Sequence, residues 1–211
     1  MKKSLMFLAV MTFCAVASAQ MTSGYMGFEG GYSSITDDSD SLRSKAIADF
    51  GGTATASQKT GVSSYRVFGG VDVNDKVSLE LGYIASSSVS STLSGRSSTA
   101  VNYTLDIGAK LTGFDYSAVW FPNRTSSQRG GFVKFGGHST KISGNGSVVA
   151  SGKTYSAELS TSGTGLQFGI GYEGDLTKTV DYRLGISRYS KLAGESGSGV
   201  TVLSAGVISR F

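Results

Sequence analysis

The chain has 211 residues, of which 30 are Gly, 1 is Pro and 1 is Cys, and only 16% are charged. A content of 39% hydrophobic and 10% aromatic residues argues against disorder, and a single cysteine excludes a disulfide framework. The net charge of +4 comes with no long basic run, so we expect no nucleic-acid partner. One domain, or at most two, remains, and the pattern of the apolar residues has to decide the fold class.

Residues 1–19 have the three parts of a secretory signal peptide: a basic head, an apolar stretch, and small residues at Ala17 and Ala19. The apolar stretch is too short for a membrane-spanning helix, which needs about 20 apolar residues. We therefore expect cleavage after Ala19 and a mature domain over residues 20–211. The only cysteine, Cys14, lies in the signal, which agrees with export to an oxidising compartment.

Beyond the signal, apolar and polar residues alternate with period two, as in β-strands that have two different faces. We expect strands over residues 25–34, 64–73, 76–85, 101–120, 131–139, 166–173, 180–189 and 200–211. Short connections after residues 73, 121 and 173 alternate with longer loops, rich in Ser, Gly and Thr, at 36–63, 86–100, 140–164 and 190–199. Short turns at one end and long loops at the other are typical of a transmembrane β-barrel.

Within the strand over residues 101–120 the alternation slips by one residue near Thr112 and Gly113. Apolar residues occupy odd positions up to Leu111 and even positions from Phe114 onward. The slip predicts a β-bulge or a bend in one long strand.

Alternation alone does not separate a soluble β-sandwich from a membrane barrel, because both have one apolar and one polar strand face. Aromatic residues such as Tyr32, Tyr83 and Trp120 lie near strand ends, where the interfacial girdles of membrane barrels sit. Glycines gather on the opposite face, where a narrow barrel interior leaves little room. We therefore predict an all-β fold, an eight-stranded antiparallel transmembrane β-barrel with short periplasmic turns and long extracellular loops. The soluble sandwich is the alternative.

The final segment has Phe211 at its end and Gly206 five positions earlier, and it resembles the C-terminal signal read by the bacterial barrel assembly machinery. Over residues 20–211 the chain resembles the OmpA-like and OmpX-like small outer-membrane barrels. The resemblance is carried by Gly24-Tyr25-Met26-Gly27, Tyr65-Arg66-Val67-Phe68-Gly69-Gly70-Val71, Leu79-Glu80-Leu81-Gly82-Tyr83, Phe132-Val133-Lys134-Phe135-Gly136-Gly137, Tyr182-Arg183-Leu184 and Leu203-Ser204-Ala205-Gly206-Val207 with Arg210-Phe211. It implies the cell outer membrane of a Gram-negative bacterium, without the periplasmic domain of OmpA, and we expect a monomer.

A nearly balanced set of charged side chains faces the lumen of the predicted barrel. The set consists of Glu29, Arg66, Glu80, Asp106, Lys110, Lys134, Glu173, Arg183 and Arg210. Because eight strands enclose a space just wide enough for side chains, we expect these groups to pair and to block a continuous pore. The resemblance implies a weak gate in which Glu80 pairs with Arg183 or with a lysine, Lys110 or Lys134, with Glu173 nearby. A purely structural network is the other interpretation.

The one histidine, His138, stands next to Ser139 and has a partial resemblance to lipid A deacylases of the PagL type. In that family the serine follows two positions after the histidine, where this chain has Thr140, and no orienting carboxylate is identifiable. One histidine and no mature cysteine offer little to a metal ion, and we expect no catalysis, metal or cofactor.

Basic side chains near the predicted outer rim can meet the anionic groups of lipopolysaccharide. They are Arg43, Lys45, Lys59, Arg96, Lys141, Lys153, Arg188 and Lys191. The sequence thus predicts an outer-membrane protein with a structural or surface-interaction role, whose loops contact lipopolysaccharide or other surfaces. A narrow gated pore is the alternative function, and lipid A hydrolysis at His138 and Ser139 is a third.

Overall fold

The computed structural model describes residues 23–34, 39–99, 101–124, 129–151, 153–194 and 198–211. The predicted signal peptide, with Ala17 and Ala19, lies outside the described residues. The described elements are β1 (Ser23–Ser34), α2 (Ser39–Phe50), β2 (Thr53–Gln58), β3 (Gly61–Asp72), β4 (Val77–Ser86), β5 (Val89–Arg96), β6 (Asn102–Trp120), β7 (Gly130–Ala150), β8 (Lys153–Asp175), β9 (Val180–Ser190), the 3-10 turn η1 (Leu192–Gly194) and β10 (Gly199–Arg210). In this part of the chain no helix is long and apolar enough to cross a membrane.

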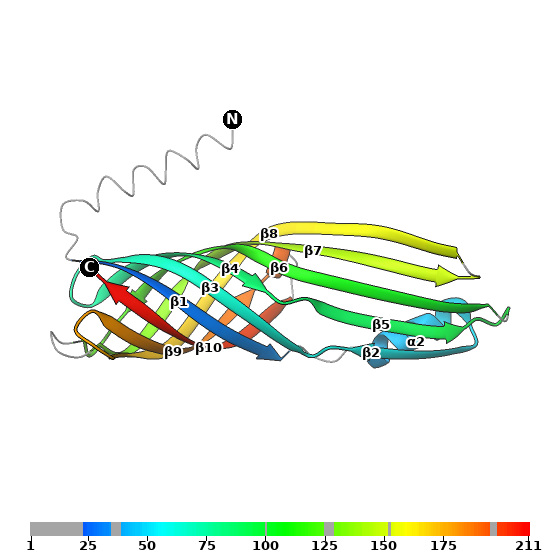
Figure 1. Ribbon diagram of the computed structural model, residues 1–211, viewed down its shortest axis with the longest axis horizontal. Helices are drawn as coiled ribbons and strands as arrows, with labels where there is room; N and C mark the ends of the chain where they lie inside the picture. Colours follow the sequence, from blue (N-terminus) through cyan, green and yellow to red (C-terminus); the bar gives the residue numbers. More distant parts are fainter. Residues whose placement is uncertain (1–22, 35–38, 100, 125–128, 152, 195–197) are drawn as a thin grey trace, which may run out of the picture.

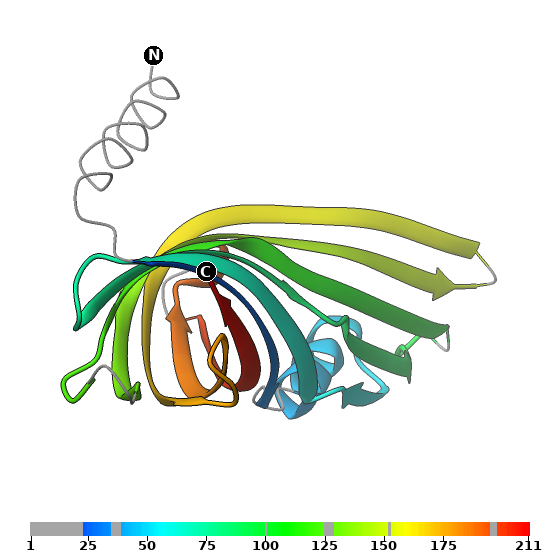
Figure 2. The same ribbon diagram turned by 60° about the vertical axis from the view of Figure 1, so that its left-hand side comes forward.

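The strands close into a ring of eight in the order β3-β1-β10-β9-β8-β7-β6-β4, because β4 pairs back onto β3. Every pairing in the ring is antiparallel, and the barrel is plain in Figure 1 and Figure 2. The turn between β3 and β4 is short because the Asn74 side chain accepts hydrogen bonds from the backbone N–H groups of Lys76 and Val77, both at 2.9 Å. The predicted eight-stranded antiparallel barrel is confirmed.

At the end opposite the short turns, part of the sheet continues beyond the ring. We call this part the extension: it consists of α2, β2, β5, residues 102–111 of β6, residues 141–150 of β7 and residues 153–164 of β8. It projects to one side of the barrel mouth, with α2 beneath it (Figure 2). Much of the sequence that we predicted as loops at 36–63, 86–100 and 140–164 therefore forms strand or helix. We did not predict these strands because they are rich in Ser, Thr and Gly, whose hydropathies differ too little to show an alternation of apolar and polar residues.

The predicted single long strand is present as β6, but of the two explanations for the slip at Thr112 and Gly113, a bulge or a bend, the bulge in β6 is wrong. The β6–β7 register runs unbroken from Tyr103 opposite Ala150 to Trp120 opposite Val133. The pairing of β6 with β7 is regular. The apolar residues of β6 lie on its outer face in the barrel wall and on its inner face in the extension, and the alternation slips where the strand passes from one to the other.

The barrel wall is apolar outside and polar inside. Large exposed apolar side chains on its outer face include Met26, Phe28, Val67, Leu81, Tyr116, Phe135, Ile170, Leu184 and Val207. Buried polar side chains inside include Glu29, Arg66, Glu80, Asp115, Lys134, Gln167, Glu173 and Arg183. This arrangement is the reverse of a soluble protein and suits a wall that meets lipid.

Candidate functional site

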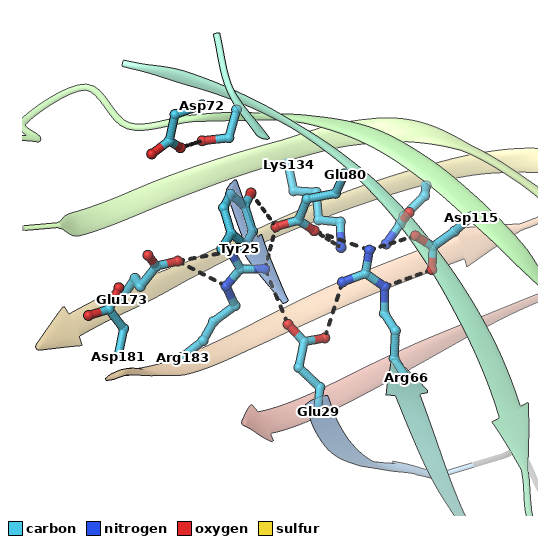
Figure 3. Close-up of polar contacts among 12 residues, drawn as sticks. Tyr25, Glu29, Arg66, Asp72, Glu80, Asp115, Lys134, Glu173, Asp181 and Arg183 are labelled. Carbon is cyan, nitrogen blue, oxygen red and sulfur yellow. Dashed lines mark hydrogen bonds and ion pairs between the residues drawn. The ribbon is translucent and has the colours of Figure 1, made fainter. Parts of the chain in front are cut away.

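Glu80, on β4, is the centre of a buried polar cluster inside the barrel. Arg183 Nη1 donates to Glu80 Oε1 at 2.7 Å, and the Tyr25 hydroxyl donates to the same oxygen at 3.1 Å. The other carboxylate oxygen lies 3.1 Å from Arg66 Nη2 and 3.3 Å from Lys134 Nζ. One carboxylate thus contacts three cationic groups at once (Figure 3).

Arg66, on β3, is held mainly by Asp115 of β6. Its Nε and Nη2 donate to the two carboxylate oxygens at 2.8 and 2.7 Å, the two-pronged geometry that positions a guanidinium most firmly. The guanidinium carbon also lies 4.3 Å from the centre of the Phe68 ring. The remaining nitrogen, Nη1, is buried and makes no hydrogen bond, and it lies 3.7 Å from Glu29 Oε2.

Arg183, on β9, links three carboxylates. Its Nε and Nη2 donate to Glu173 Oε2 at 3.1 and 2.8 Å, while Nη1 reaches Glu80 and lies 3.4 Å from Glu29 Oε1. Glu29 is therefore the most loosely held carboxylate of the cluster, because its two cationic neighbours lie at 3.4 and 3.7 Å.

A second layer of ion pairs lies toward the short turns. Arg210 donates to Glu173 and to Asp181, and Arg124 Nη2 donates to Asp72 at 2.6 Å. Two small apolar clusters lie at the same end, Tyr25 with Phe68 and Ile208, and Val119 with Phe121 and Phe132. This end of the lumen is packed with side chains.

Arg129, just before β7, belongs to the same layer and lies 3.4 Å from Asp181. Partial burial, together with the positive charges of Arg210 and Arg124, lowers the pKa of Arg129. Arginine nevertheless stays protonated in proteins, so Arg129 contributes a fixed positive charge at this end.

Small residues make room for the cluster. A Cβ atom at Gly27 would lie 2.2 Å from the Phe68 ring, and one at Gly82 would lie 2.7 Å from Arg66 Nε. The predicted concentration of glycines on the inner face thus has a direct steric reason.

The structure brings together most of the lumen residues that the sequence suggested. Those in the cluster are Glu80, Arg183, Glu173, Lys134, Arg66 and Glu29, with Arg210 in the adjoining layer. Lys110 and Asp106 are not among them, because the regular register of β6 places both on the exposed outer face. Our inward placement of these two residues was wrong, since it assumed that the apolar face points outward along the whole strand.

Sequence reasoning missed Asp115 and Tyr25 as members of the cluster. Asp115 was findable, because it lies between Phe114 and Tyr116, whose side chains face outward. Tyr25 also lies near a strand end, where we expected the aromatic residues to form a girdle, yet it is buried and donates to Glu80. An aromatic residue near a strand end does not reveal its face by position alone.

A cavity of ≈ 570 Å³ lies above the cluster, in the half of the lumen toward the extension. Glu29 and Arg66 belong to its lining, so the loosest carboxylate and the free guanidinium nitrogen are both at its floor. Its apolar lining includes Val62, Ile84, Leu111, Ile142, Val200 and Val202. Serine hydroxyls and charged side chains alternate with these apolar residues around the cavity. Its size and its mixed lining suit a small amphipathic molecule.

His138 and Ser139 lie on opposite faces of β7. His138 is buried in the lumen, where Nε2 lies 2.8 Å from the carbonyl oxygen of Ser190 and Nδ1 lies 3.4 Å from Thr140 Oγ1. Thr140 Oγ1 accepts a hydrogen bond from the backbone N–H of Ala193 at 3.0 Å. His138 thus helps to seat η1 against the inner wall, and it does not meet the Ser139 hydroxyl.

A closed antiparallel ring that is apolar outside and ion-paired inside defines a transmembrane β-barrel. The chain belongs to the family of the outer membrane protein beta-barrel domain, whose model matches residues 5–211. This membership points to the outer membrane of a Gram-negative bacterium. No curated protein matches the chain.

Several solved outer-membrane proteins are similar to the chain. The attachment invasion locus protein Ail of Yersinia pestis, in complex with the heparin analogue sucrose octasulfate, is 13% identical, with a TM-score of 0.45 over 90% of this chain and 100% of that one. Neisserial surface protein A is 17% identical, with a TM-score of 0.40 over 89% and 97% of the two chains. OprG from Pseudomonas aeruginosa is 10% identical, with a TM-score of 0.42 over 91% and 97%.

Proposed function

We propose that the protein acts at the cell surface by binding extended polypeptide segments along its extension. The observation that carries this proposal is the outer edge of β8. β8 pairs with β7 from Lys153 to Glu173, whereas its pairing with β9 begins only at Gln167. Among the described residues, the first half of β8 therefore has a strand neighbour on one side only.

The open edge presents regularly spaced backbone groups. The Leu166 carbonyl oxygen accepts a hydrogen bond from Ser190 Oγ at 3.1 Å, so this carbonyl points toward the β9 side. Because alternate residues of an antiparallel strand point their backbone groups to the same side, the even-numbered residues before Leu166 point to the open edge. On the open part of the edge these residues are Thr154, Ser156, Glu158 and Ser160, whereas η1 packs against the strand beyond them, where Gly194 meets Gly163.

The side chains beside the edge favour a polypeptide partner. Tyr155 and Leu159 are 61% and 70% exposed, and Val148 on the neighbouring strand shares their face. Proteins usually protect such edges with charges or proline, yet Glu158 is the only charged residue from 154 to 164, and none is proline. A partner strand added here gains main-chain hydrogen bonds and buries these apolar side chains.

The test removes the edge while keeping the barrel. Ser143 and Ser160 are register partners, so residues 144–159 can be replaced by a two-residue Asn-Gly turn. The probe is reduced, carboxymethylated lysozyme, an extended polypeptide, and binding to the barrel in lipid nanodiscs is followed by interferometry. The replacement also uncovers residues 103–109 of β6, whose partners are residues 144–150, so we expect weaker binding and leave the decision to a point variant in β8. The heat-dependent shift in gel mobility shows that the barrel remains closed.

A point variant separates edge pairing from general stickiness. Ser156→Pro removes an N–H group that faces the open edge, and we expect about fivefold weaker binding because a neutral hydrogen bond contributes roughly 1 kcal/mol. Ser156→Ala keeps the N–H group and serves as the matched control. Equal binding by Ser156→Pro and Ser156→Ala would remove the proposal.

Contact with lipopolysaccharide is supported by two lysines on the outer face. Lys110 lies opposite Ser143, and Lys141 lies opposite Thr112, so the two lysines are diagonal neighbours on adjacent strands. They stand just above Phe114, whose exposed ring is on the lipid side. The double variant Lys110→Gln/Lys141→Gln is expected to lose retention on lipopolysaccharide vesicles, and unchanged retention would count against this contact.

A gated pore is the second candidate function. It is supported by the simultaneous contacts of Glu80 with Arg183 and Lys134. A gate would open if the Glu80 carboxylate exchanged one of these two cationic partners for the other and so moved a charged side chain out of the lumen. Glu80→Ala is expected to change conductance in planar bilayers. The absence of channel events in both proteins would exclude a conducting lumen.

Biogenesis follows from the export features of the sequence. The backbone N–H and C=O groups of Phe211 exchange hydrogen bonds with Gly24 at 3.0 and 3.1 Å, where β10 meets β1. A Cβ at Gly206 would lie 2.2 Å from the Phe28 carbonyl oxygen, so this glycine fits the same seam. If the assembly machinery recognises Phe211, Phe211→Ala lowers the amount of folded barrel in cells. Cleavage after Ala19 is a separate prediction. Mass spectrometry of the purified protein locates the cleavage site.

A further inference from the structure

The upper lumen holds a polar pair that the rest of the cluster leaves incomplete. Glu29 Oε2 and Arg66 Nη1 are 3.7 Å apart, beyond hydrogen-bond distance, and both residues line the cavity. The two remaining guanidinium nitrogens of Arg66 are occupied by Asp115, and Nη1 makes no hydrogen bond. The floor of the cavity is therefore formed by the Glu29 carboxylate and by a guanidinium whose Nη1 is buried beside it with an unused N–H donor, so a ligand reaches Nη1 when the Glu29 side chain turns toward the ligand.

We infer that this cavity binds a small zwitterion with an apolar side chain, of the class of free aliphatic α-amino acids. Its ammonium group pairs with the Glu29 carboxylate, and its carboxylate accepts a hydrogen bond from Arg66 Nη1. Adjacent ammonium and carboxylate groups match the adjacent positions of these two side chains.

The cavity walls match the rest of such a molecule. Val62, Ile84 and Val202 lie beside the floor, and Leu111 and Ile142 continue the apolar wall toward the extension. A branched aliphatic side chain buries its surface there, at about 25 cal/mol per Å² removed from water. Hydroxyl groups of Ser33, Ser64, Ser187 and Ser204 are also on the lining and can replace water around the charged end.

The charge of the cluster favours a zwitterion over a simple ion. Its carboxylates are Glu29, Glu80, Asp115 and Glu173, and they are matched by the cations Arg66, Lys134, Arg183 and, on Glu173, Arg210. A simple anion adds an uncompensated negative charge to this balanced group. An ammonium ion alone leaves Arg66 Nη1 without an acceptor. A zwitterion adds no net charge and satisfies both groups, which is how buried charges become tolerable.

The experiment compares three probes of almost the same shape on the complete barrel in lipid nanodiscs. L-leucine carries both charged groups, isoamylamine lacks the carboxylate, and 4-methylpentanoate lacks the ammonium group. Saturation-transfer NMR and calorimetry measure affinity. We expect saturable leucine binding that is about tenfold tighter than that of either analogue, because each lost charged hydrogen bond is worth roughly 1.5–3 kcal/mol.

Two variants locate the site. Ala109→Phe fills the cavity from β6 without touching the ion pair, and we expect it to abolish leucine binding. Thr112→Phe, on the outer face of the same strand, is the matched control and should change affinity by no more than about twofold. Glu29→Gln is expected to weaken leucine binding and to leave the weak binding of 4-methylpentanoate unreduced. Heat-dependent gel mobility checks that each variant is folded.

Each possible binding result supports or overturns the proposed zwitterion site. Selective leucine binding that Ala109→Phe removes supports the site. Isoamylamine binding as tight as leucine binding would show a cation site and overturn the zwitterion. Equal, unsaturable signals from all three probes would show a water-filled vestibule only. Ala109, Leu111 and Ile142, at the base of the extension, line the cavity, but none of the lining residues lies in 144–159. The variant lacking residues 144–159 should therefore still bind leucine whether or not it binds polypeptides.

Discussion

The barrel wall and the extension are built from the same long strands, yet their apolar residues lie on opposite faces: the outer face in the barrel wall and the inner face in the extension. In the barrel part of β6, Phe114 and Tyr116 are 61% and 63% exposed on the outside, while Asp115 is buried in the lumen. In the extension part of the same strand, Leu105 faces the inner side with Leu93, and Asp106 lies on the outer face. The register of β6 with β7 is unbroken between the two parts, and the one-residue shift where β5 takes over from β4 lies in those neighbouring strands. The surroundings on each side therefore select the apolar face.

β8 makes the same switch. Phe168 and Ile170 point outward from the barrel, whereas Tyr155 and Leu159 lie on the inner face of the extension, whose outer face is Ser- and Thr-rich. A barrel wall has lipid outside, whereas an extension above the membrane has water on its outer face. The level at which the apolar face changes sides therefore marks the outer boundary of the membrane, near Thr112.

The largest expected effect comes from breaking the inside of the barrel. Arg183→Met leaves Glu80 and Glu173 without their shared buried partner, and we expect a loss of about 3–5 kcal/mol in the free energy of unfolding. Urea unfolding in lipid vesicles, followed by the fluorescence of Trp120, measures it.

Arg188→Met is the matched control for this substitution. Arg188 is on the same strand, but it is exposed and donates to Thr201 Oγ1 at 3.1 Å. We expect a change within about 0.5 kcal/mol. Similar losses in the two variants would mean that the lumen cluster does not stabilise the barrel.

The next effect concerns the outer faces of the two regions. Leu81→Arg places a charge on the lipid side of the wall, which costs about 2–4 kcal/mol near the middle of a bilayer. Val149→Arg places the same charge on the outer face of the extension, where we expect a change of at most about 0.5 kcal/mol. Folding titrations in vesicles compare the two variants. An equal cost at both positions would place the extension in lipid and contradict the boundary near Thr112.

The sequence was sufficient for the barrel because a strand between lipid and a lumen has a strong, regular contrast. Strands such as β4, where Leu81 and Tyr83 alternate with Glu80 and Gly82, were predicted almost to the residue. The lumen cluster followed from that alternation, since Glu80, Arg66 and Arg183 oppose apolar neighbours. Its pairing partners did not follow, because contacts such as Arg66 with Asp115 depend on strand order and register.

The extension was not predictable in the same way. Its outer face is Ser- and Thr-rich and its inner face has only scattered apolar residues, so residues 140–164 looked like a loop. The face switch in β6 was visible as a change of phase at Thr112, and we interpreted it as a bulge or a bend in one long strand. A phase change in a regular strand instead signals a change of surroundings, and the same assumption misplaced Lys110.

The smallest effect tests the inner face of the extension, where α2 provides the cover that the lumen provides in the barrel. The Phe50 ring of α2 packs against Tyr103 of β6, with ring centres 5.5 Å apart, and Ala46 is buried. Phe50→Ala removes this aromatic pair, worth about 1 kcal/mol, and we expect faster amide hydrogen exchange in α2 and β2. Ile47→Ala, which shortens an aliphatic side chain of α2 that is not part of this ring pair, is the control. The unfolding of the barrel should be unchanged in both variants, because the two regions bury separate sets of side chains. Slower folding or lower stability of the barrel in Phe50→Ala would show instead that wall and extension form one cooperative unit, and that the apolar inner face of the extension supports the barrel.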